Sequence, residues 1–374
     1  MRALFVASPM VGHVLPLVPL AAAFRDAGHD VLFATAAEGV GAVQKAGIPA
    51  RDVAPKLNVG RVFAGPLLRH PVRILRMVGG DTGTSGVSVL FAAMTARLAP
   101  GTVALAEDWR PDLVLHEGLA AAGAVTAARR GVPSVLVDAL IYDGCSLYSA
   151  VISHLGRLAR QYGLAAIPEP ADAVTAIPAS LAGERRGRSM RYVPATGHGD
   201  VPESLVRPDR PVVLVSRSTV NDPRPDRMMA RVAKAAECAG VDVVLVRPDR
   251  SVARGRLPAN VTTTDWLPFA SVMPHVAGVV THGGSGTVMT TLAAGVPLVV
   301  VPGPGDRTLH ARLVAQRGAG MAVPPAEITA ETLERLVTDP GLKAAAGEVA
   351  AEIAAMPAPG ELVQPLLDGV RSAS

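Results

Sequence analysis

The chain has 374 residues, 49% of them hydrophobic and 18% charged, so it is long enough for about two domains with large cores and is not disordered. Its formal net charge is +4, and no run of basic residues with interleaved aromatic residues indicates nucleic-acid binding. The two cysteines, Cys145 and Cys238, and nine dispersed histidines favour neither a disulfide framework nor a metal site.

The first residues have the pattern of a strand, a turn and a helix. Residues 2–8 are a short β-rich run, and residues 17–27 have a helical pattern that Gly28 ends. A signal peptide is the alternative, but Pro9 and Pro16 interrupt its apolar stretch. No window of about 20 uninterrupted apolar residues indicates a membrane span. We therefore expect a soluble cytoplasmic protein.

Strands and helices alternate along both halves of the chain, which predicts an α/β protein with parallel sheets. Residues 183–210 are rich in proline, glycine and charge, and we interpret them as the linker between domains 1–200 and 201–374, with a last helix that could pack back on the first domain. The later expected strands cover residues 30–34, 113–115, 133–137, 211–215, 241–246, 261–263, 276–280 and 297–301. The later expected helices cover residues 94–109, 120–130, 224–239, 330–356 (two helices) and 361–370.

Two segments, residues 57–91 and 140–165, show no regular pattern. An insertion such as the first is usually a functional loop region or a mobile segment. The first contains six glycines and four arginines among apolar residues, and the second contains three of the four tyrosines. Residues 61–76 would suit a membrane surface. We favour the other interpretation, a buried helix of a loop region.

A glycine-rich turn follows the strand expected at residues 276–280. Backbone N–H groups between a strand and a helix form an anion site, and hydroxyl and imidazole groups there can donate to phosphate. The next strand ends near Asp306 and Arg307, so two strand ends converge on one crevice. A purely structural turn is the alternative, but this double arrangement favours an anion site. The turn consists of His282, Gly283, Gly284, Ser285, Gly286 and Thr287, with a helical pattern from Val288.

Three motifs occur in order along the chain: GHVLP from Gly12, WLP from Trp266 and HGGSGT from His282, followed by Asp306. Together they resemble the nucleotide-sugar glycosyltransferases of the GT-B fold, in particular the bacterial enzymes that glycosylate macrolides, enediynes and aromatic polyketides. The resemblance covers nearly the whole chain. It implies two Rossmann-like domains facing each other across a cleft, with an acceptor pocket in the first and a nucleotide-sugar site in the second.

The resemblance also implies how the donor is held. A dTDP- or UDP-sugar would place its diphosphate on residues 282–287 and its base beside Trp266, with the pyrimidine edge on the Leu267 backbone. Asp306 would accept hydrogen bonds from sugar hydroxyls, and Ser218 is included in this donor site. For Trp266 the alternative is a core side chain. No cofactor or metal is expected besides the nucleotide sugar.

Three positions depart from the family pattern. Thr290 stands where relatives often have a glutamate that contacts ribose hydroxyls, which favours dTDP over UDP. Arg307, counted here in the donor site, replaces a glutamine and leaves the sugar's identity open. Arg217 stands where a glycine is usual, so it either reaches the diphosphate or crowds the donor.

The resemblance assigns the general base to His13, since imidazole can take a proton from an attacking hydroxyl near neutral pH. Glu117 matches the family's acidic position, often an aspartate, and would orient the imidazole. His116 could compete with Glu117 for the cleft. No second carboxylate is placed as a nucleophile, so we expect direct displacement with inversion.

The leading hypothesis is an inverting glycosyltransferase that moves a deoxysugar from a dTDP-sugar to a hydroxyl of a small hydrophobic aglycone in antibiotic biosynthesis. The alternatives are a C-glycosyltransferase acting on an activated phenol, a nucleotide-sugar epimerase, a lipid-sugar transferase and a non-catalytic nucleotide-sugar-binding partner. Acceptor selectivity is expected in residues 57–91 and 140–165. A nucleic-acid or membrane partner is not favoured, and a homodimer stays open.

Overall fold

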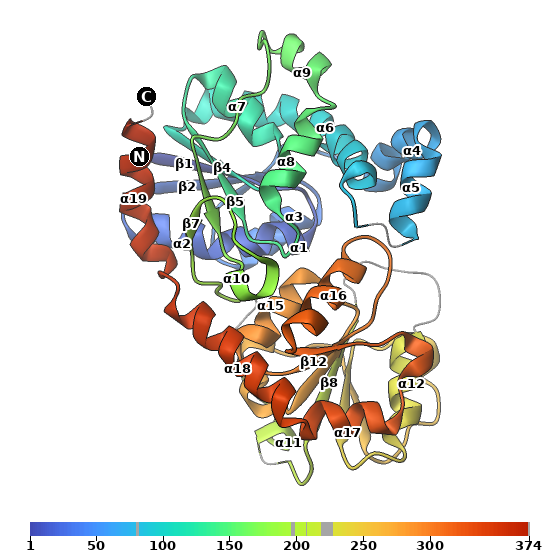
Figure 1. Cartoon of the computed structure of the whole chain (residues 1–374). Helices are drawn as coiled ribbons and strands as arrows, with labels where there is room; N and C mark the ends of the chain where they lie inside the picture. The colour runs from blue at the N-terminus through green and yellow to red at the C-terminus, as the bar shows by residue number, and fades with distance from the viewer. Residues whose placement is uncertain (80–81, 196–198, 207, 218–226, 373–374) are drawn as a thin grey trace. The chain divides into compact units, whose positions relative to one another are not determined.

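The computed structural model describes residues 1–79, 82–195, 199–206, 208–217 and 227–372, and the chain divides into two compact units (Figure 1). Unit 1 comprises Met1–Ile177, Glu184–Ala195 and Met356–Ser374, and unit 2 comprises Pro178–Gly183 and Thr196–Ala355. The chain therefore changes units more than once; the sequence placed the main division at residue 200 and allowed the last helix to return to the first domain. The last helix, α19, belongs to unit 1 and packs against α2.

The sheet of unit 1 has the strand order β3-β2-β1-β4-β5-β6-β7 among the described residues, and its neighbouring strands pair in parallel. Its central strand β1 is buried from Ala3 to Val6, which explains its nearly continuous apolar sequence. The strands are β1 (Arg2–Val6), β2 (Asp30–Thr35), β3 (Ala50–Asp52), β4 (Leu113–His116), β5 (Ser134–Asp138), β6 (Asp172–Thr175) and β7 (Arg188–Ser189).

The sheet of unit 2 repeats this arrangement with the order β10-β9-β8-β11-β12-β13 in the part of the chain that is described. All its pairs are parallel as well, so the expectation of parallel α/β domains is confirmed in both units. The strands are β8 (Val212–Ser216), β9 (Asp242–Val246), β10 (Val261–Thr264), β11 (Gly278–Thr281), β12 (Leu298–Val300) and β13 (Gly320–Ala322).

The helices of unit 1 cover its sheet, and α6 is the longest of those described. By length and composition α6 could cross a membrane, but 61% of its most apolar window is buried, and it packs against α4, α7 and α8 as a core helix. The helices are α1 (Val11–Val14), η1 (Leu15–Leu17), α2 (Val18–Asp26), α3 (Glu38–Lys45), α4 (Val59–Arg69), α5 (Pro71–Val78), α6 (Ser85–Trp109), α7 (Ala122–Arg130), α8 (Gly144–Ile152), α9 (Gly156–Gln161) and α19 (Pro359–Ser372).

The helices of unit 2 include two consecutive ones, α17 and α18, where the sequence predicted two helices. The helices are α10 (Ala179–Ala182), α11 (Glu203–Val206), α12 (Arg227–Ala236), α13 (Arg250–Ala253), α14 (Phe269–Val272), η2 (Met273–His275), α15 (Ser285–Ala293), α16 (Arg307–Arg317), η3 (Pro325–Glu327), α17 (Ala330–Thr338) and α18 (Pro340–Ala355).

The prediction that residues 57–91 and 140–165 lack regular structure is wrong. The first segment forms α4, α5 and the start of α6, and the second forms α8 and α9. The helices were not predicted because glycine and proline interrupt the helical pattern. Pro66 lies inside α4, and Pro71 occupies the first turn of α5, where a missing N–H costs no hydrogen bond.

The interpretation of residues 183–210 as a linker is also wrong in part. Arg188–Ser189 forms β7, which pairs with β6 at the edge of the unit 1 sheet. A strand of two residues, both exposed, carries no apolar alternation, so the sequence pattern could not reveal it.

Each sheet reverses its strand order beside its first strand. In unit 1 this happens between β1 and β4, and in unit 2 between β8 and β11. Open α/β sheets bind ligands outside the carboxyl ends of the strands at such a switch point. His13 and Glu117 follow β1 and β4, while Ser216 ends β8 and His282 follows β11, so predicted site residues lie at both switch points.

Candidate active site

In unit 1 the structure brings His13 and Glu117 together. His13 Nδ1 lies 2.7 Å from Glu117 Oε2, and the exposed fractions of the two side chains are 17% and 3%. The other carboxylate oxygen, Oε1, accepts a hydrogen bond of 2.7 Å from the buried backbone N–H of Ser8. Both oxygens of Glu117 therefore have a partner, and the carboxylate fixes the orientation of the imidazole through its Nδ1 edge.

Strand register explains why these two residues meet. Val6 of β1 pairs with His116 of β4, and the Glu117 N–H donates to the Val6 carbonyl, so both chains leave the sheet side by side. His13 then lies in the short helix α1, one turn past the end of β1.

His116, the alternative partner, is directed elsewhere. Its side chain is completely buried, its Nδ1 lies 3.0 Å from the Glu117 carbonyl oxygen, and its ring packs 5.4 Å from that of Tyr148. Burial lowers the pKa of His116 to about 4, so the imidazole is neutral at pH 7. Glu117, and not His116, is the neighbour of His13.

An aromatic row extends from His13. The ring of Phe91, on α6, lies 5.5 Å from the imidazole, and the ring of Phe63, on α4, lies 5.9 Å from Phe91. Tyr142 lines a small cavity that also contacts Glu117. The sequence did not single out Phe63 or Phe91, because both fall in the segment interpreted as irregular; their share of the few aromatic residues was the available signal.

In unit 2 the glycine-rich turn forms the start of α15. The helix begins at Ser285 and not at Val288, with Gly284 as an N-cap that has no side-chain hydrogen bond. Gly283 has φ +86°, and a Cβ there would lie 2.8 Å from Val300 Cγ1, so this position requires glycine. A Cβ on Gly286 would meet no atom within 4 Å, so there is open space beside the helix end. This geometry suits an anion.

His282 is held at the base of this turn by two neighbouring segments. Its Nδ1 lies 3.4 Å from the Ser216 carbonyl oxygen, and its own carbonyl oxygen accepts a 2.6 Å hydrogen bond from Arg307 Nε. Burial, and then the charge of Arg307, lower the pKa of His282 to about 4. The imidazole is therefore neutral at pH 7, and with its proton on Nδ1 its Nε2 is an acceptor. The prediction that His282 donates to phosphate thus requires a change of tautomer or an added proton.

Asp306 and Arg307 lie at the start of α16, beside the same turn. The Asp306 side chain is half exposed, and its Oδ2 lies 3.6 Å from Nε2 of the buried His310. His310 Nδ1 lies 2.6 Å from the Gly283 carbonyl oxygen, to which it can donate, and so ties α16 to the turn. His310 was missed in the sequence, although its i,i+4 spacing from Asp306 would have pointed to it.

Trp266 and Leu267 follow β10, the edge strand of the same sheet. The Trp266 side chain is 62% exposed, which rules out the core interpretation, whereas Leu267 is buried. Thr264 Oγ1 donates to the Trp266 carbonyl at 3.1 Å and so fixes the backbone of this turn. Thr290 is buried on α15. Ser218 lies outside the described residues.

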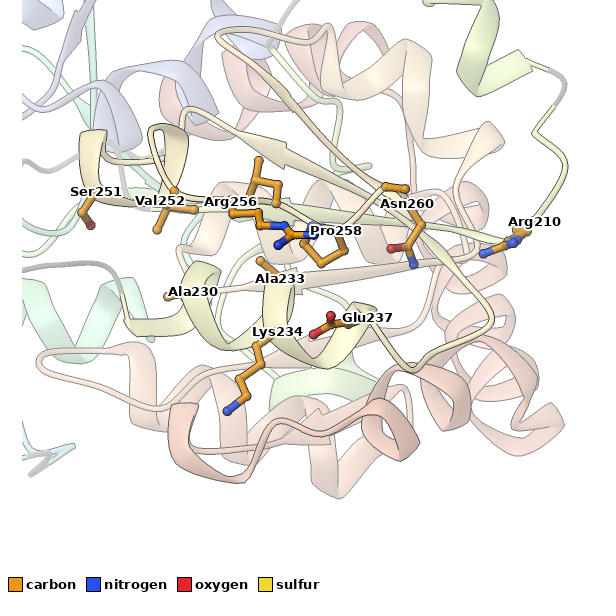
Figure 2. A pocket seen from close by; sticks show the side chains of 13 residues that line it. Arg210, Ala230, Ala233, Lys234, Glu237, Ser251, Val252, Arg256, Pro258 and Asn260 are labelled. Carbon is orange, nitrogen blue, oxygen red and sulfur yellow. The ribbon is translucent and has the colours of Figure 1, made fainter.

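A groove of about 1030 Å³ lies elsewhere on unit 2, between α12 and the segment around α13 (Figure 2). Lys234 on α12 and Glu237, directly after this helix, line one side of it, and Arg256 and Pro258 line the other side. None of the predicted donor residues is among its lining residues. It also reaches Arg210, which precedes β8, and so extends to the amino ends of the strands, away from the edge where α/β sheets bind ligands.

The family models of the erythromycin biosynthesis protein CIII-like proteins match the chain in two parts, the N-terminal domain over residues 22–217 and the C-terminal domain over residues 230–368. The elloramycin glycosyltransferase ElmGT of Streptomyces olivaceus is 34% identical over 371 residues, which cover 97% of this chain and 96% of that relative. The chain belongs to this family. It is a glycosyltransferase.

Solved structures of glycosyltransferases agree with this assignment. SnogD from Streptomyces nogalater superposes with a TM-score of 0.82 at 30% identity, over 98% of this chain and 99% of SnogD. The spinosyn rhamnosyltransferase SpnG, complexed with thymidine diphosphate, gives a TM-score of 0.81 at 27% identity, over 98% of this chain and 100% of SpnG. Another SpnG structure holds the spinosyn aglycone. The expected GT-B fold and natural-product glycosyltransferase family are confirmed.

Metal ligands were not expected for this glycosyltransferase. Among the residues that the structure describes, no group of three or more His, Cys, Asp or Glu side chains could hold a metal ion.

Proposed function

We propose that this glycosyltransferase transfers a deoxysugar from dTDP to a hydroxyl of a hydrophobic aglycone with inversion, with His13 as the general base. The observation that carries the proposal is the 2.7 Å contact between His13 and the buried Glu117, because such a carboxylate fixes the imidazole's tautomer and stabilises the imidazolium that forms. This arrangement supports catalysis over a merely sugar-binding role.

The reaction needs one displacement. The acceptor oxygen forms a bond to the anomeric carbon while the bond from that carbon to the diphosphate oxygen breaks. The acceptor proton passes to His13 Nε2, since Nδ1 faces Glu117 and donates to it. The nucleoside diphosphate leaves with the bonding electrons, and the negative charge that develops on it suits the start of α15.

The donor proposal rests on the residues around α15. The diphosphate would lie against residues 282–287, the base would stack on the exposed Trp266, and Asp306 would accept hydrogen bonds from sugar hydroxyls. The thymidine diphosphate bound to SpnG supports dTDP as the carrier. Thr290 supports it too, because its short buried side chain cannot offer the carboxylate that a ribose 2′-hydroxyl would favour.

The acceptor proposal rests on the aromatic row beside the base. Phe91 and Phe63 present apolar faces next to His13, which favours a hydrophobic and at least partly planar acceptor over a sugar or a peptide. The relatives' names, which include antibiotic glycosyltransferases, support a natural-product aglycone. We propose that the enzyme acts in the cytoplasm.

The test is the His13→Ala variant. Turnover should fall by roughly 10²–10⁴-fold, the usual contribution of a general base, while the affinity for dTDP stays unchanged because His13 belongs to unit 1 and the donor residues belong to unit 2. Product formation from dTDP-sugars and a panel of polyketide aglycones can be followed by mass spectrometry, and dTDP binding by calorimetry.

His29→Ala is the matched control, since His29 precedes β2 at the opposite end of the same sheet. It should retain wild-type turnover. Full activity in His13→Ala would rule out the proposed base.

A further inference from the structure

Exposed apolar side chains are concentrated on one short stretch of unit 1. Among the described residues, nine large hydrophobic side chains are exposed, and five of them lie between residues 67 and 78. Their average exposed fraction is higher than that of the other four, and the highest values are those of Leu68 at 83% and Leu75 at 70%. We call this stretch of α4 and α5 the α4–α5 surface; its exposed apolar members are Leu67, Leu68, Val72, Leu75 and Val78.

The same stretch has a one-sided charge. Residues 53–79 contain no aspartate or glutamate. They contain five side chains that are cationic at neutral pH, each on an exposed residue, so positive charge surrounds the apolar side chains. The five cations are Lys56, Arg61, Arg69, Arg73 and Arg76.

The helices turn this surface away from the core. On α5, Ile74 is buried and Met77 packs on the core, while Val72, Leu75 and Val78 face outward. On α4 no residue is fully buried, although Val62 and Phe63 pack against the core. Both helices contact α6 at the side of unit 1 away from α19 (Figure 1). The interpretation of residues 61–76 as a buried helix is therefore wrong for their outer face.

We propose that the α4–α5 surface docks on an anionic lipid bilayer. Leucine and valine side chains would enter the boundary between head groups and acyl chains, and the arginines beside them would reach lipid phosphates. A second copy of the chain fits less well, because a two-fold interface would bring the same five cations against each other. A neutral small molecule would need the apolar side chains but not the arginines.

Docking on a bilayer would allow the enzyme to take its acceptor substrate from the membrane. This part of the inference rests on the proposed function. The inner face of α4 carries Phe63, which contacts Phe91, which in turn contacts His13. One short helix thus has lipid-facing side chains outside and, inside, the row that leads to the base. A lipophilic aglycone dissolved in the bilayer would be concentrated beside the site that uses it.

Vesicle co-sedimentation of the full chain tests the docking directly. The protein should pellet with vesicles that contain phosphatidylglycerol, and pellet much less with phosphatidylcholine alone or at high salt. In the double variant Leu68→Ser, Leu75→Ser the bound fraction should fall roughly ten-fold or more, because two exposed leucines no longer enter the bilayer. Arg73→Gln with Arg76→Gln should weaken binding to the anionic vesicles alone.

The control changes exposed valines elsewhere, Val193→Ser and Val206→Ser, and should bind vesicles like the wild type. Thermal melting should be unchanged in every variant, since the altered side chains are exposed. The affinity for dTDP without vesicles should be unchanged in the leucine variant, because the donor residues belong to unit 2. His13→Ala should still pellet, so that a failure of docking and a failure of the catalytic proposal are distinguishable.

Three results would overturn the proposal. One is a wild-type protein that stays in the supernatant with anionic vesicles. Another is binding to polyglutamate without binding to vesicles, which would assign the surface to an acidic protein. The third is a dimer in light scattering that the leucine variant dissociates, which would assign the surface to a second copy of the chain.

Discussion

The two switch points differ in how completely their side chains are held. In unit 1, Glu117 is 3% exposed, and both its oxygens already have hydrogen-bond partners. In unit 2, two side chains expected to meet the donor are open to solvent: Trp266 is 62% exposed and Asp306 is half exposed. What is fixed in unit 2 is the backbone, through Arg307 and His310.

The difference matches the two tasks that we propose. A general base must have one tautomer before the acceptor arrives, so its carboxylate partner has to be in place without ligand. A donor site gains its contacts when the nucleotide sugar binds. Exposure of an aromatic ring or a carboxylate to water in the free protein costs little free energy. Substitutions in the two units test whether unit 1 is preorganised and unit 2 is completed by its ligand.

Glu117→Gln should have the largest effect. The amide oxygen of a glutamine can still accept the hydrogen bond from the Ser8 N–H, but the amide NH2 then faces His13 Nδ1. Because this NH2 is a donor, it favours the tautomer with the proton on Nε2, in which the imidazole cannot accept the acceptor's proton. Turnover should fall by up to about 10⁴-fold, the loss that follows when the aspartate of a Ser-His-Asp triad is changed to asparagine. The Michaelis constant for the donor should change little. Steady-state kinetics at saturating donor measures both.

Glu169→Gln is the matched control, because this carboxylate of unit 1 lies on the surface in an exposed pair with Arg186. If Glu117→Gln turned over as fast as the control, the carboxylate would not orient the base, and unit 1 would not be preorganised in the sense proposed.

The predictable part of the fold comes from strong local signals. Continuous apolar runs such as those of β1 and β11 predicted buried parallel strands, and the glycines around His282 predicted the turn into a helix. The resemblance to the family also implied that His13 and Glu117 belong to one site. The two residues are 104 positions apart in the sequence, and they meet because β1 pairs with β4. No local sequence pattern predicts that pairing.

The unpredicted parts depend on tertiary contacts. The helices α4 and α5 are held by packing on α6 although glycine and proline interrupt their sequences, and β7 exists because β6 offers an edge. His310 supports the turn through a carbonyl 27 residues earlier. Such partners are set by the folded chain and cannot be derived from helical or strand periodicity.

Two buried histidines, one in each unit, predict an acid-dependent loss of stability. His116 and His282 have pKa values lowered to about 4 from 6.5, mainly by burial. As the pH falls from 6.5 to 4 the unfolded chain binds protons that the folded protein does not, so the free energy of unfolding falls; below about 4 this dependence ends. Each histidine accounts for on the order of 3 kcal/mol.

The variants His116→Asn and His282→Asn test the contribution of each unit in turn. In both, the asparagine amide can replace the histidine Nδ1 as donor to the carbonyl oxygen. Each should flatten the dependence of the melting temperature on pH between 6.5 and 4. An unaltered slope in both buried variants would contradict the assignment. Diphosphate should reduce the slope only through His282, if it draws a proton onto that imidazole.

Trp266→Ala should have the smallest effect, and one confined to the donor. Loss of base stacking should weaken dTDP binding roughly ten-fold, with nearly unchanged turnover at saturating donor. Because the ring is mostly exposed, the melting temperature should not change. Trp109→Ala, the only other tryptophan, should do the reverse: it packs on the core of unit 1, so its loss should lower the melting temperature and leave dTDP affinity intact. Calorimetry and thermal melting of both variants decide whether donor binding depends on the Trp266 ring, and Trp266→Phe should restore part of the dTDP affinity. If Trp266→Ala, Trp266→Phe and Trp109→Ala all bound dTDP as tightly as the wild type, the nucleotide's base would not stack on Trp266.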